Sequence, residues 1–274
     1  MGLYEAGLSF KSSMMEAVSN QEPASYLDAN GDRIAYRHIR GDGPTILWLG
    51  GFLSDMTGSK IARLSAEARA RNWDFLCFDY YAHGETGGPF DSATVGRWFA
   101  NVLAVADHLT QGPLVAIGSS MGGHMLSLLI KARSDRVIAA GFLAPAADFA
   151  TALMLPSLSP EDRRQLEVSG VYMMPGYDRP VPLSQAFFAE AARHQVLTEP
   201  IPFTGPVRIL HGMKDDVVPW RHGVRLLEAF ATPDVHIHLI KDGDHRLSRP
   251  RDLDLLVAMV AELRACQTVE TGTT

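Results

Sequence analysis

The sequence predicts an α/β fold in which a mostly parallel sheet of eight strands is flanked by helices. Short apolar and β-branched runs alternate with longer segments whose apolar residues recur every three or four positions. This alternation is typical of parallel strands joined by crossover helices. One long stretch, between about Ala146 and Thr204, contains no convincing strand pattern, and it predicts a helical lid inserted after the sixth strand.

The predicted elements follow one another along most of the chain. Asp91 is the expected N-cap of a helix with apolar positions from Val95 to Leu109, and the last helix follows Pro250. The eight predicted strands are Ser25–Asp28, Arg33–His38, Thr45–Leu49, Phe75–Asp79, Leu114–Gly118, Val137–Leu143, Val207–Leu210 and Val235–Ile240.

Two helices are expected within the lid. Ser159 followed by Pro160 indicates a cap and a first helical residue, and a second helix is expected from about Ser184 to Val196, with prolines in the connections. The predicted division of the chain is a core of residues 1–145 and 205–268, a lid of residues 146–204 and a loose tail of residues 269–274.

Composition limits the classes of function. The chain has 274 residues, 46% of them hydrophobic, and its 31 acidic against 25 basic residues give a net charge of -6. This argues against a disordered protein and against a nucleic-acid partner, which normally requires a basic surface. No apolar run reaches the roughly 18 residues of a membrane span. Two cysteines suit a reducing compartment, and the first 22 residues show no secretory or Arg-rich leader, so a cytoplasmic location is expected.

The strongest chemical signal is the segment from Gly118 to Gly122, in which Ser120 lies at the centre of a G-x-S-x-G pattern. A buried-type strand precedes it and helix-forming residues follow it, which is the context of a nucleophile elbow. Glycines two residues to either side remove Cβ atoms that would collide in so sharp a turn. Ser120 is therefore the predicted nucleophile, and an ordinary glycine-rich turn is the structural alternative.

A serine nucleophile requires a histidine base and a carboxylate, which follow it in the order acid, then histidine, when the nucleophile lies on such an elbow. Asp215 and Asp216 come directly after the seventh predicted strand, and both qualify by chemistry. His245 lies in the loop between the last strand and the last helix, and it completes the order.

Other histidines have simpler interpretations. His236 and His238 alternate along a strand and are expected to decorate one face of it. His124 and His83 could border the pocket, although a lone histidine at such a place is more often a hydrogen-bonded structural residue. His211 is interpreted as the end of a strand, oriented by local hydrogen bonds.

Together these motifs resemble the α/β-hydrolase family from about Tyr26 to Leu263. Within it, the chain is similar to the mitochondrial acyl-protein thioesterases and acyl-glucuronide esterases of the α/β-hydrolase-domain proteins and to their bacterial relatives. The most specific stretch runs from Pro206 to Trp220. Its G-x-x-D-x-x-V-P spacing matches the family's acid turn and selects Asp215 rather than Asp216.

The resemblance implies a serine hydrolase of carboxylic esters or acyl thioesters with Ser120, Asp215 and His245 as its triad. No metal or organic cofactor is expected. The oxyanion donors of this fold are the backbone N–H after the nucleophile, here Met121, and one from the loop after an earlier strand, here Phe52. The structural alternative for Gly50-Gly51 in that loop is a plain turn.

The lid is rich in apolar side chains that could line an acyl site or could only pack the lid onto the core. The expected substrate is a small molecule or an acylated protein with an apolar acyl group. The alternatives are a proline-type aminopeptidase, a lyase or cofactorless peroxidase on the same fold, and a noncatalytic binding protein. The candidate substrate-binding residues are Met154, Tyr172, Met173, Phe187 and Phe188.

Overall fold

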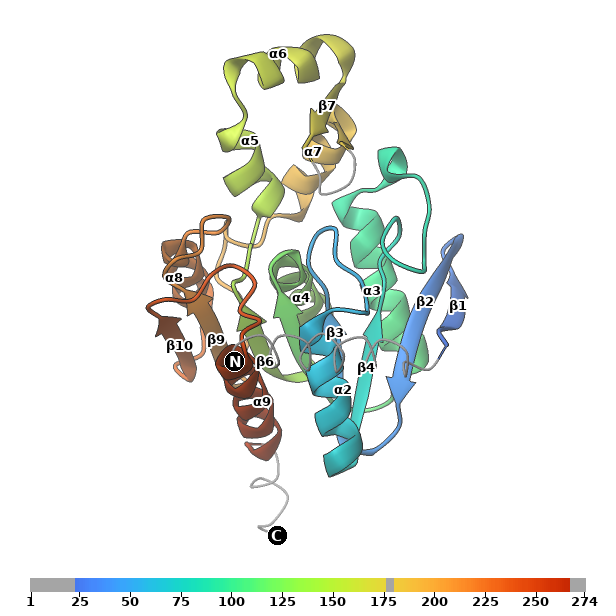
Figure 1. Cartoon of the computed structure of the whole chain (residues 1–274), viewed down its shortest axis with the longest axis vertical. Helices are drawn as coiled ribbons and strands as arrows, with labels where there is room; N and C mark the ends of the chain where they lie inside the picture. Colours follow the sequence, from blue (N-terminus) through green and yellow to red (C-terminus); the bar gives the residue numbers. More distant parts are fainter. Residues whose placement is uncertain (1–22, 176–179, 267–274) are drawn as a thin grey trace, which may run out of the picture.

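The computed structural model describes residues 23–175 and 180–266, and the eight predicted strands form one sheet in it (Figure 1). The strand order across the sheet is β1-β2-β4-β3-β5-β6-β9-β10. The predicted α/β fold with a mostly parallel eight-stranded sheet is therefore confirmed. The strands are β1 (Ser25–Ala29), β2 (Asp32–Ile39), β3 (Asp42–Leu49), β4 (Trp73–Phe78), β5 (Leu114–Ser119), β6 (Val137–Leu143), β9 (Val207–Gly212) and β10 (Val235–Ile240).

The strand directions determine where the loops meet. Strand β2 pairs antiparallel with β1 and β4, whereas β4, β3, β5, β6, β9 and β10 pair parallel with one another in that order. The carboxyl ends of the parallel strands therefore lie at one edge of the sheet. Open α/β sheets bind ligands at this edge, because the connecting loops are free to carry polar side chains there.

Helices cover both faces of the sheet because successive strand residues point to opposite sides. On β3, Ile46 belongs to the core cluster shared with α2 (Ser59–Arg71) and α9 (Pro250–Ala265). Its neighbour Leu47 belongs to the cluster of the other face, which includes residues of three further helices. Those helices are α3 (Val95–Leu109), α4 (Met121–Ala132) and α8 (Trp220–Ala229). No helix in the described ranges is long and apolar enough to cross a membrane.

The start of α3 differs from the prediction. Its N-cap is Thr94, whose side chain accepts a hydrogen bond from the Arg97 N–H at 3.2 Å. Asp91 instead lies in the 3₁₀ turn η1 (Phe90–Ser92), one turn before the helix. A cap must directly precede the first helical residue to reach its free N–H groups, so Asp91 is too far from Val95.

Between β6 and β9 the chain forms a projection at the top of the molecule in Figure 1. The helix expected after Ser159 is present with a reciprocal capping box, and the next helix starts after Ser184 but is shorter than expected. The elements of the projection are the π-helix η2 (Phe149–Met154), α5 (Leu155–Ser157), α6 (Pro160–Ser169), β7 (Val171–Met174), β8 (Val181–Ser184), α7 (Gln185–Ala191) and η3 (Ala192–His194).

The expectation that this projection contains no strand is wrong. Strands β7 and β8 pair antiparallel as a separate two-stranded sheet, with Met173 opposite Pro182. Proline lacks the N–H of a central strand but is tolerated in an edge strand, and both strands here are edges. The limits 146–204 for the lid remain a prediction. The predicted tail lies outside the described residues.

Candidate active site

Ser120 lies in a strained turn between β5 and α4. Its φ of 54° and ψ of -118° are unfavourable for a residue with a Cβ atom. The flanking glycines make the turn sterically possible: a Cβ on Gly118 would lie 2.4 Å from the Gly122 carbonyl oxygen, and one on Gly122 would lie 2.0 Å from the Leu49 carbonyl oxygen. The backbone therefore presents Ser120 at the amino end of α4, at the carboxyl edge of the sheet.

Three side chains from distant segments form a continuous hydrogen-bonded chain. His245 Nε2 is 3.1 Å from Ser120 Oγ, and His245 Nδ1 is 2.8 Å from Asp215 Oδ2. Because the carboxylate only accepts hydrogen bonds, Nδ1 carries the proton and Nε2 is free to accept the serine proton. The structure thus brings together the three side chains predicted as a triad, and it leaves Asp216 exposed.

Close backbone packing places the Asp215 and His245 loops side by side. A Cβ on Gly212 would lie 2.3 Å from the Gly243 carbonyl oxygen, so the two chains touch at these glycines. Two backbone hydrogen bonds join the same loops, from the Met213 N–H to the Ile240 carbonyl and from the Lys214 N–H to the Gly243 carbonyl. The parallel pairing of β9 with β10 continues in this way into the turns that carry the two side chains.

Asp215 is held as a carboxylate by its surroundings. Its Oδ1 accepts hydrogen bonds from the N–H groups of Val217 and Val218 at 2.9 and 2.7 Å. Burial would raise the pKa of Asp215, but hydrogen bonds from His211, His245 and the Val218 N–H outweigh burial and hold the pKa well below its usual value. The ionised Asp215 carboxylate is therefore placed to accept the Nδ1 proton of His245 in a hydrogen bond.

His211 and Lys60 contact the loops of the site. His211 lies near the end of β9 and makes a local hydrogen bond, as expected, whereas the contact of Lys60 was not predicted. His211 is fully buried, its Nε2 donates to the Val218 carbonyl at 2.9 Å and it lies 3.4 Å from Asp215 Oδ2. Lys60 Nζ donates to the Arg246 carbonyl at 2.5 Å, next to His245 in the chain. Burial lowers the pKa of Lys60 to about 8. His211 lies within a motif that the sequence analysis identified, whereas Lys60 lies in no such motif.

The two predicted oxyanion donors lie next to Ser120 in the chain or in space. Met121 is the first residue of α4, where backbone N–H groups have no partner within the helix. Phe52 follows Gly51 in the loop after β3, and a Cβ on Gly51 would lie 3.4 Å from the Ser120 Cβ. This close approach of Gly51 brings the loop that carries Phe52 to Ser120.

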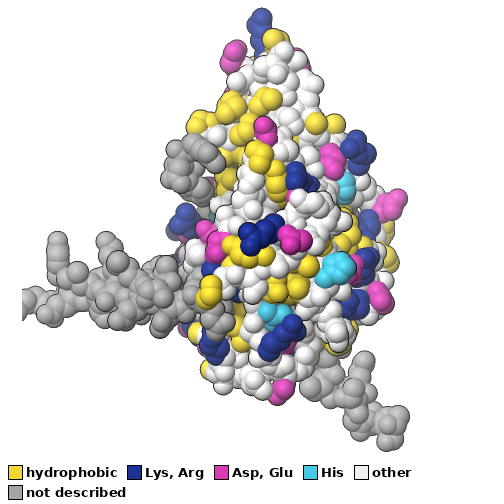
Figure 2. Space-filling view, turned by 90° about the vertical axis from the view of Figure 1, so that its right-hand side faces the viewer, with side chains coloured by type: hydrophobic (Ala, Val, Ile, Leu, Met, Phe, Trp, Pro, Cys, Tyr) yellow, Lys and Arg dark blue, Asp and Glu magenta, His cyan; other side chains and the backbone are white. Residues whose placement is uncertain are grey.

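The predicted substrate residues of the projection fall into two groups. Phe187 and Phe188 are buried, and the Phe187 ring packs against Trp98 and Phe149. Met154 and Tyr172 are half-buried, and Met173 is 43% exposed. Figure 2 shows hydrophobic side chains gathered on the upper part of the face in view and mixed charges below them. Phe187 joins the projection to α3, and Met154 and Tyr172 pack against the same apolar cluster, whereas Met173 is exposed.

Two further features of the described residues bear on the kind of site. Within them, no group of three or more His, Cys, Asp and Glu side chains could hold a metal ion. A groove of about 510 Å³ lies between β10 and α9, lined among others by His236, His238 and Met259, and it includes no predicted site residue. His236 and His238 are exposed on β10, as expected.

Comparison with known proteins identifies the family. The Alpha/beta hydrolase family matches residues 46–257 of the chain. The chain belongs to the alpha/beta hydrolase family. It is 36% identical over 236 residues to a protein from mouse named palmitoyl-protein thioesterase ABHD10, mitochondrial. The aligned residues cover 84% of this chain and 78% of that protein. These relationships show that the protein is a hydrolase.

Solved structures agree with this assignment. The structure of alpha/beta hydrolase domain-containing protein 10 from mouse matches with a TM-score of 0.81 and 34% identity, over 88% of this chain and 98% of that chain. A putative hydrolase from Agrobacterium vitis S4 matches with a TM-score of 0.82 and 32% identity, over 89% of this chain and 100% of that chain. The resemblance inferred from the sequence is confirmed.

The expected cytoplasmic location is wrong by this comparison. The matching curated relatives from mouse, Rattus norvegicus, Bos taurus, Pongo abelii and Homo sapiens are all named as mitochondrial proteins. A low cysteine count indicates a compartment where disulfides are rare, and it does not single out one such compartment. The amino-terminal 22 residues, which entered the same inference, lie outside the described part of the chain.

Proposed function

We propose that this hydrolase cleaves acyl thioesters and carboxylic esters through an acyl-enzyme on Ser120, with His245 as general base and Asp215 as its carboxylate partner. The observation that supports this proposal most directly is the unbroken chain of hydrogen bonds at 3.1 and 2.8 Å from Ser120 to His245 to Asp215. Nucleophile, base and orienting carboxylate lie at the spacing that acyl transfer requires.

In the proposed mechanism, Ser120 Oγ attacks the acyl carbonyl carbon while His245 Nε2 accepts the hydroxyl proton. The tetrahedral intermediate collapses, the carbon–sulfur or carbon–oxygen bond breaks, and His245 gives the proton to the leaving thiolate or alkoxide. Water then attacks the acyl-enzyme with His245 again as the base, and the acid leaves. Asp215 remains ionised throughout and stabilises the imidazolium.

The proposed oxyanion site consists of the Phe52 and Met121 N–H groups. The negative charge that develops on the carbonyl oxygen needs donors fixed before the reaction, and one such donor contributes about 3–4 kcal/mol to the transition state. Gly51 supports this assignment, because its close approach to Ser120 brings the loop that carries Phe52 to the reacting atoms.

An apolar acyl group on a small molecule or a protein is the proposed substrate. The mouse relative is named a palmitoyl-protein thioesterase. Met154, Tyr172 and Met173 are the side chains proposed to contact the acyl chain, because Phe187 and Phe188 are occupied in packing. We expect kcat/KM to rise from C2 to C8 acyl thioesters, since each buried methylene contributes about 0.8 kcal/mol. A steady fall over the same series contradicts the acyl-site proposal.

The Ser120→Ala variant tests the mechanism. It removes only the hydroxyl and should leave a folded protein that neither hydrolyses p-nitrophenyl butyrate nor reacts with a fluorophosphonate probe, whereas the wild type does both. Circular dichroism is the control for folding. Turnover retained by the folded variant would refute Ser120 as nucleophile, and a wild type inert to ester, thioester and probe would favour a noncatalytic role.

A further inference from the structure

The loop that carries Phe52 is held by a buried histidine outside the triad. The Leu53 N–H donates to His83 Nε2 at 3.0 Å, and His83 Nδ1 lies 2.9 Å from the Tyr81 carbonyl oxygen. An N–H only donates and a carbonyl only accepts, so His83 carries its proton on Nδ1 and accepts on Nε2. His83 is 3% exposed. Its imidazole is thus a fixed link between two backbone segments.

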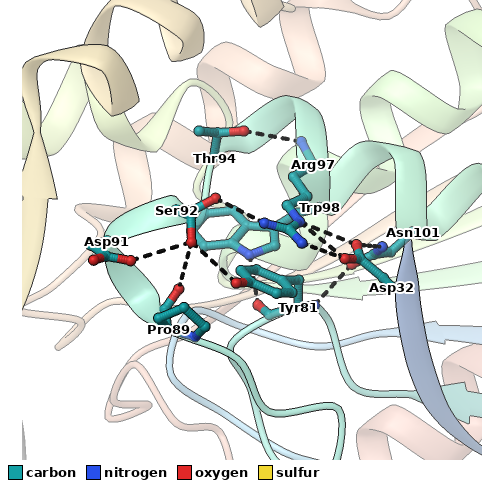
Figure 3. Close-up of polar contacts among 9 residues, drawn as sticks. All are labelled: Asp32, Tyr81, Pro89, Asp91, Ser92, Thr94, Arg97, Trp98 and Asn101. Carbon is teal, nitrogen blue, oxygen red and sulfur yellow. Dashed lines mark hydrogen bonds and ion pairs between the residues drawn. The ribbon is translucent and has the colours of Figure 1, made fainter. Parts of the chain in front are cut away.

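Tyr81, at the other end of this link, is itself fixed by a dense polar network. Its carbonyl also accepts from Trp98 Nε1 at 3.0 Å, and its N–H donates to Asn101 Oδ1 at 2.8 Å. Figure 3 shows Arg97 and Asn101 converging on Asp32, with the Tyr81 ring close by. The Arg97 guanidinium lies 3.3 Å from the centre of that ring. The anchor on which His83 rests is therefore rigid.

His83 contacts the loop next to Ser120 in two ways, through the Leu53 N–H and through the Phe52 ring. Leu53 has a φ of 56°, a strained value for leucine, and the His83 hydrogen bond fixes its N–H in that conformation. The Phe52 ring packs edge-on against both His83 and Trp98, with centroids 6.2 and 5.9 Å apart. The Phe52 N–H belongs to the Gly51–Phe52 peptide, which is joined through the Phe52 Cα both to the Phe52 ring and to the peptide that carries the Leu53 N–H. A shift of either contact is therefore transmitted through that one Cα to the Phe52 N–H.

We propose that His83 is a positioning residue that sets the Phe52 N–H for the oxyanion, through the Leu53 amide and the Phe52 ring. The inference rests on the proposed function, because it requires an acyl-transfer oxyanion beside Ser120. Burial lowers the pKa of His83, which keeps Nε2 available as an acceptor. A protonated ring would present an N–H to the Leu53 N–H and break the link.

Two substitutions separate positioning from folding. His83→Phe keeps an aromatic ring and removes the acceptor, whereas the side-chain amide oxygen of His83→Gln can accept from Leu53 in place of Nε2. We expect His83→Phe to lower kcat about 10- to 100-fold with KM changed less than about twofold, because a misplaced oxyanion donor weakens only transition-state binding. His83→Gln should recover most of this loss.

The second readout is inhibition by an alkyl trifluoromethyl ketone, whose adduct with Ser120 carries an oxyanion, compared with the matched methyl ketone. Across the variants, affinity for the trifluoromethyl ketone should fall in parallel with kcat/KM, and affinity for the methyl ketone should not. If His83→Phe does not fold, His83→Leu, which also removes the acceptor, takes its place in this comparison. The control is His236→Gln on exposed β10, which should match the wild type in every measurement.

Each outcome is decisive. A folded His83→Phe with wild-type kcat, or any folded variant whose loss of rate leaves the trifluoromethyl ketone affinity unchanged, overturns the positioning role alone. A His83→Gln variant as slow as His83→Phe also overturns it. A wild type that binds no trifluoromethyl ketone and hydrolyses no ester or thioester overturns the proposed function, and the inference fails with it.

Discussion

His124 should make the stability of the protein fall in acid. Its side chain is 2% exposed, and its Nδ1 accepts the Asp148 N–H at 2.9 Å, which joins α4 to the chain entering the projection. Burial lowers the pKa of His124 from 6.5 to about 3. In the His124→Asn variant, the asparagine Oδ1 can accept the hydrogen bond from the same Asp148 N–H, but it does not titrate. Comparing the wild type with this variant therefore isolates the effect of one proton.

The sign follows from the two pKa values. Below about pH 6.5 the unfolded chain binds a proton at His124 while the folded chain stays neutral down to about pH 3, so falling pH favours unfolding in this window. The full slope for one proton is about 1.4 kcal/mol per pH unit. Between pH 7 and pH 5 the wild type should lose about 2 kcal/mol relative to His124→Asn, a large share of a stability of about 5–15 kcal/mol.

Urea unfolding of both proteins at pH 7 and pH 5 measures this difference. His236→Asn, an exposed histidine on β10, is the control and should change the free energy of unfolding by less than about 0.5 kcal/mol at either pH. A difference between wild type and His124→Asn that is constant with pH would refute the reasoning. The opposite sign would show that the Asp148 carboxylate, 3.4 Å from Nδ1, stabilises the protonated form of His124 in the folded state.

Two further substitutions test the support of the site. Gly122→Ala should lower the free energy of unfolding by about 1–3 kcal/mol and slow fluorophosphonate labelling, because its Cβ would lie 2.0 Å from the Leu49 carbonyl oxygen. The control is Gly58→Ala, where a Cβ has room. Equal behaviour of the two variants would contradict the steric argument. Lys60→Met, which removes the donor to the Arg246 carbonyl, should lower kcat about tenfold with little change in KM. Lys60→Arg should restore kcat. An unchanged kcat in Lys60→Met would show that this contact has no effect on catalysis.

The sheet was predictable because its central strands are buried on both faces. Such strands consist of nearly continuous apolar runs, as in Val137–Leu143, whereas the outer strands β1, β2 and β10 include exposed polar residues. All eight predicted strands lie in one sheet. Strands β7 and β8 were missed because each is only four residues long and β8 contains Pro182, which argues against a strand interior. Their pairing depends on the surrounding projection, and local sequence does not encode that context.

The three side chains of the candidate site were predictable for a different reason. Each lies within about five residues after the end of a strand, in a motif whose glycines mark a tight turn or a close contact, so a local pattern identified each of them. The burial of both Phe187 and Phe188 was harder to predict. Spacing on a helix predicts that adjacent residues point apart, yet α7 packs against α3, β8 and η2 at once and buries both.

What the sequence did not predict is the hydrogen-bond partner of each side chain behind the reacting groups. His83, Lys60 and His211 each bind a backbone atom of a different loop: the Leu53 N–H, the Arg246 carbonyl and the Val218 carbonyl. A backbone N–H or carbonyl is present at nearly every residue, so the loop sequence contains no sign of its partner, and two of the partners lie 30 and 186 positions away.

These contacts also predict how the substitutions differ. Replacing Ser120 removes a bond-forming atom and should abolish turnover, whereas replacing a backbone contact only broadens the positions that a loop samples and should lower the rate in part. If all three loops must be aligned in the same transition state, changes at His83 and Lys60 should combine less than multiplicatively, because a site already misaligned by one loop loses less when a second loop moves. Fully multiplicative losses in the double variant would show instead that the oxyanion loop and the His245 loop act independently.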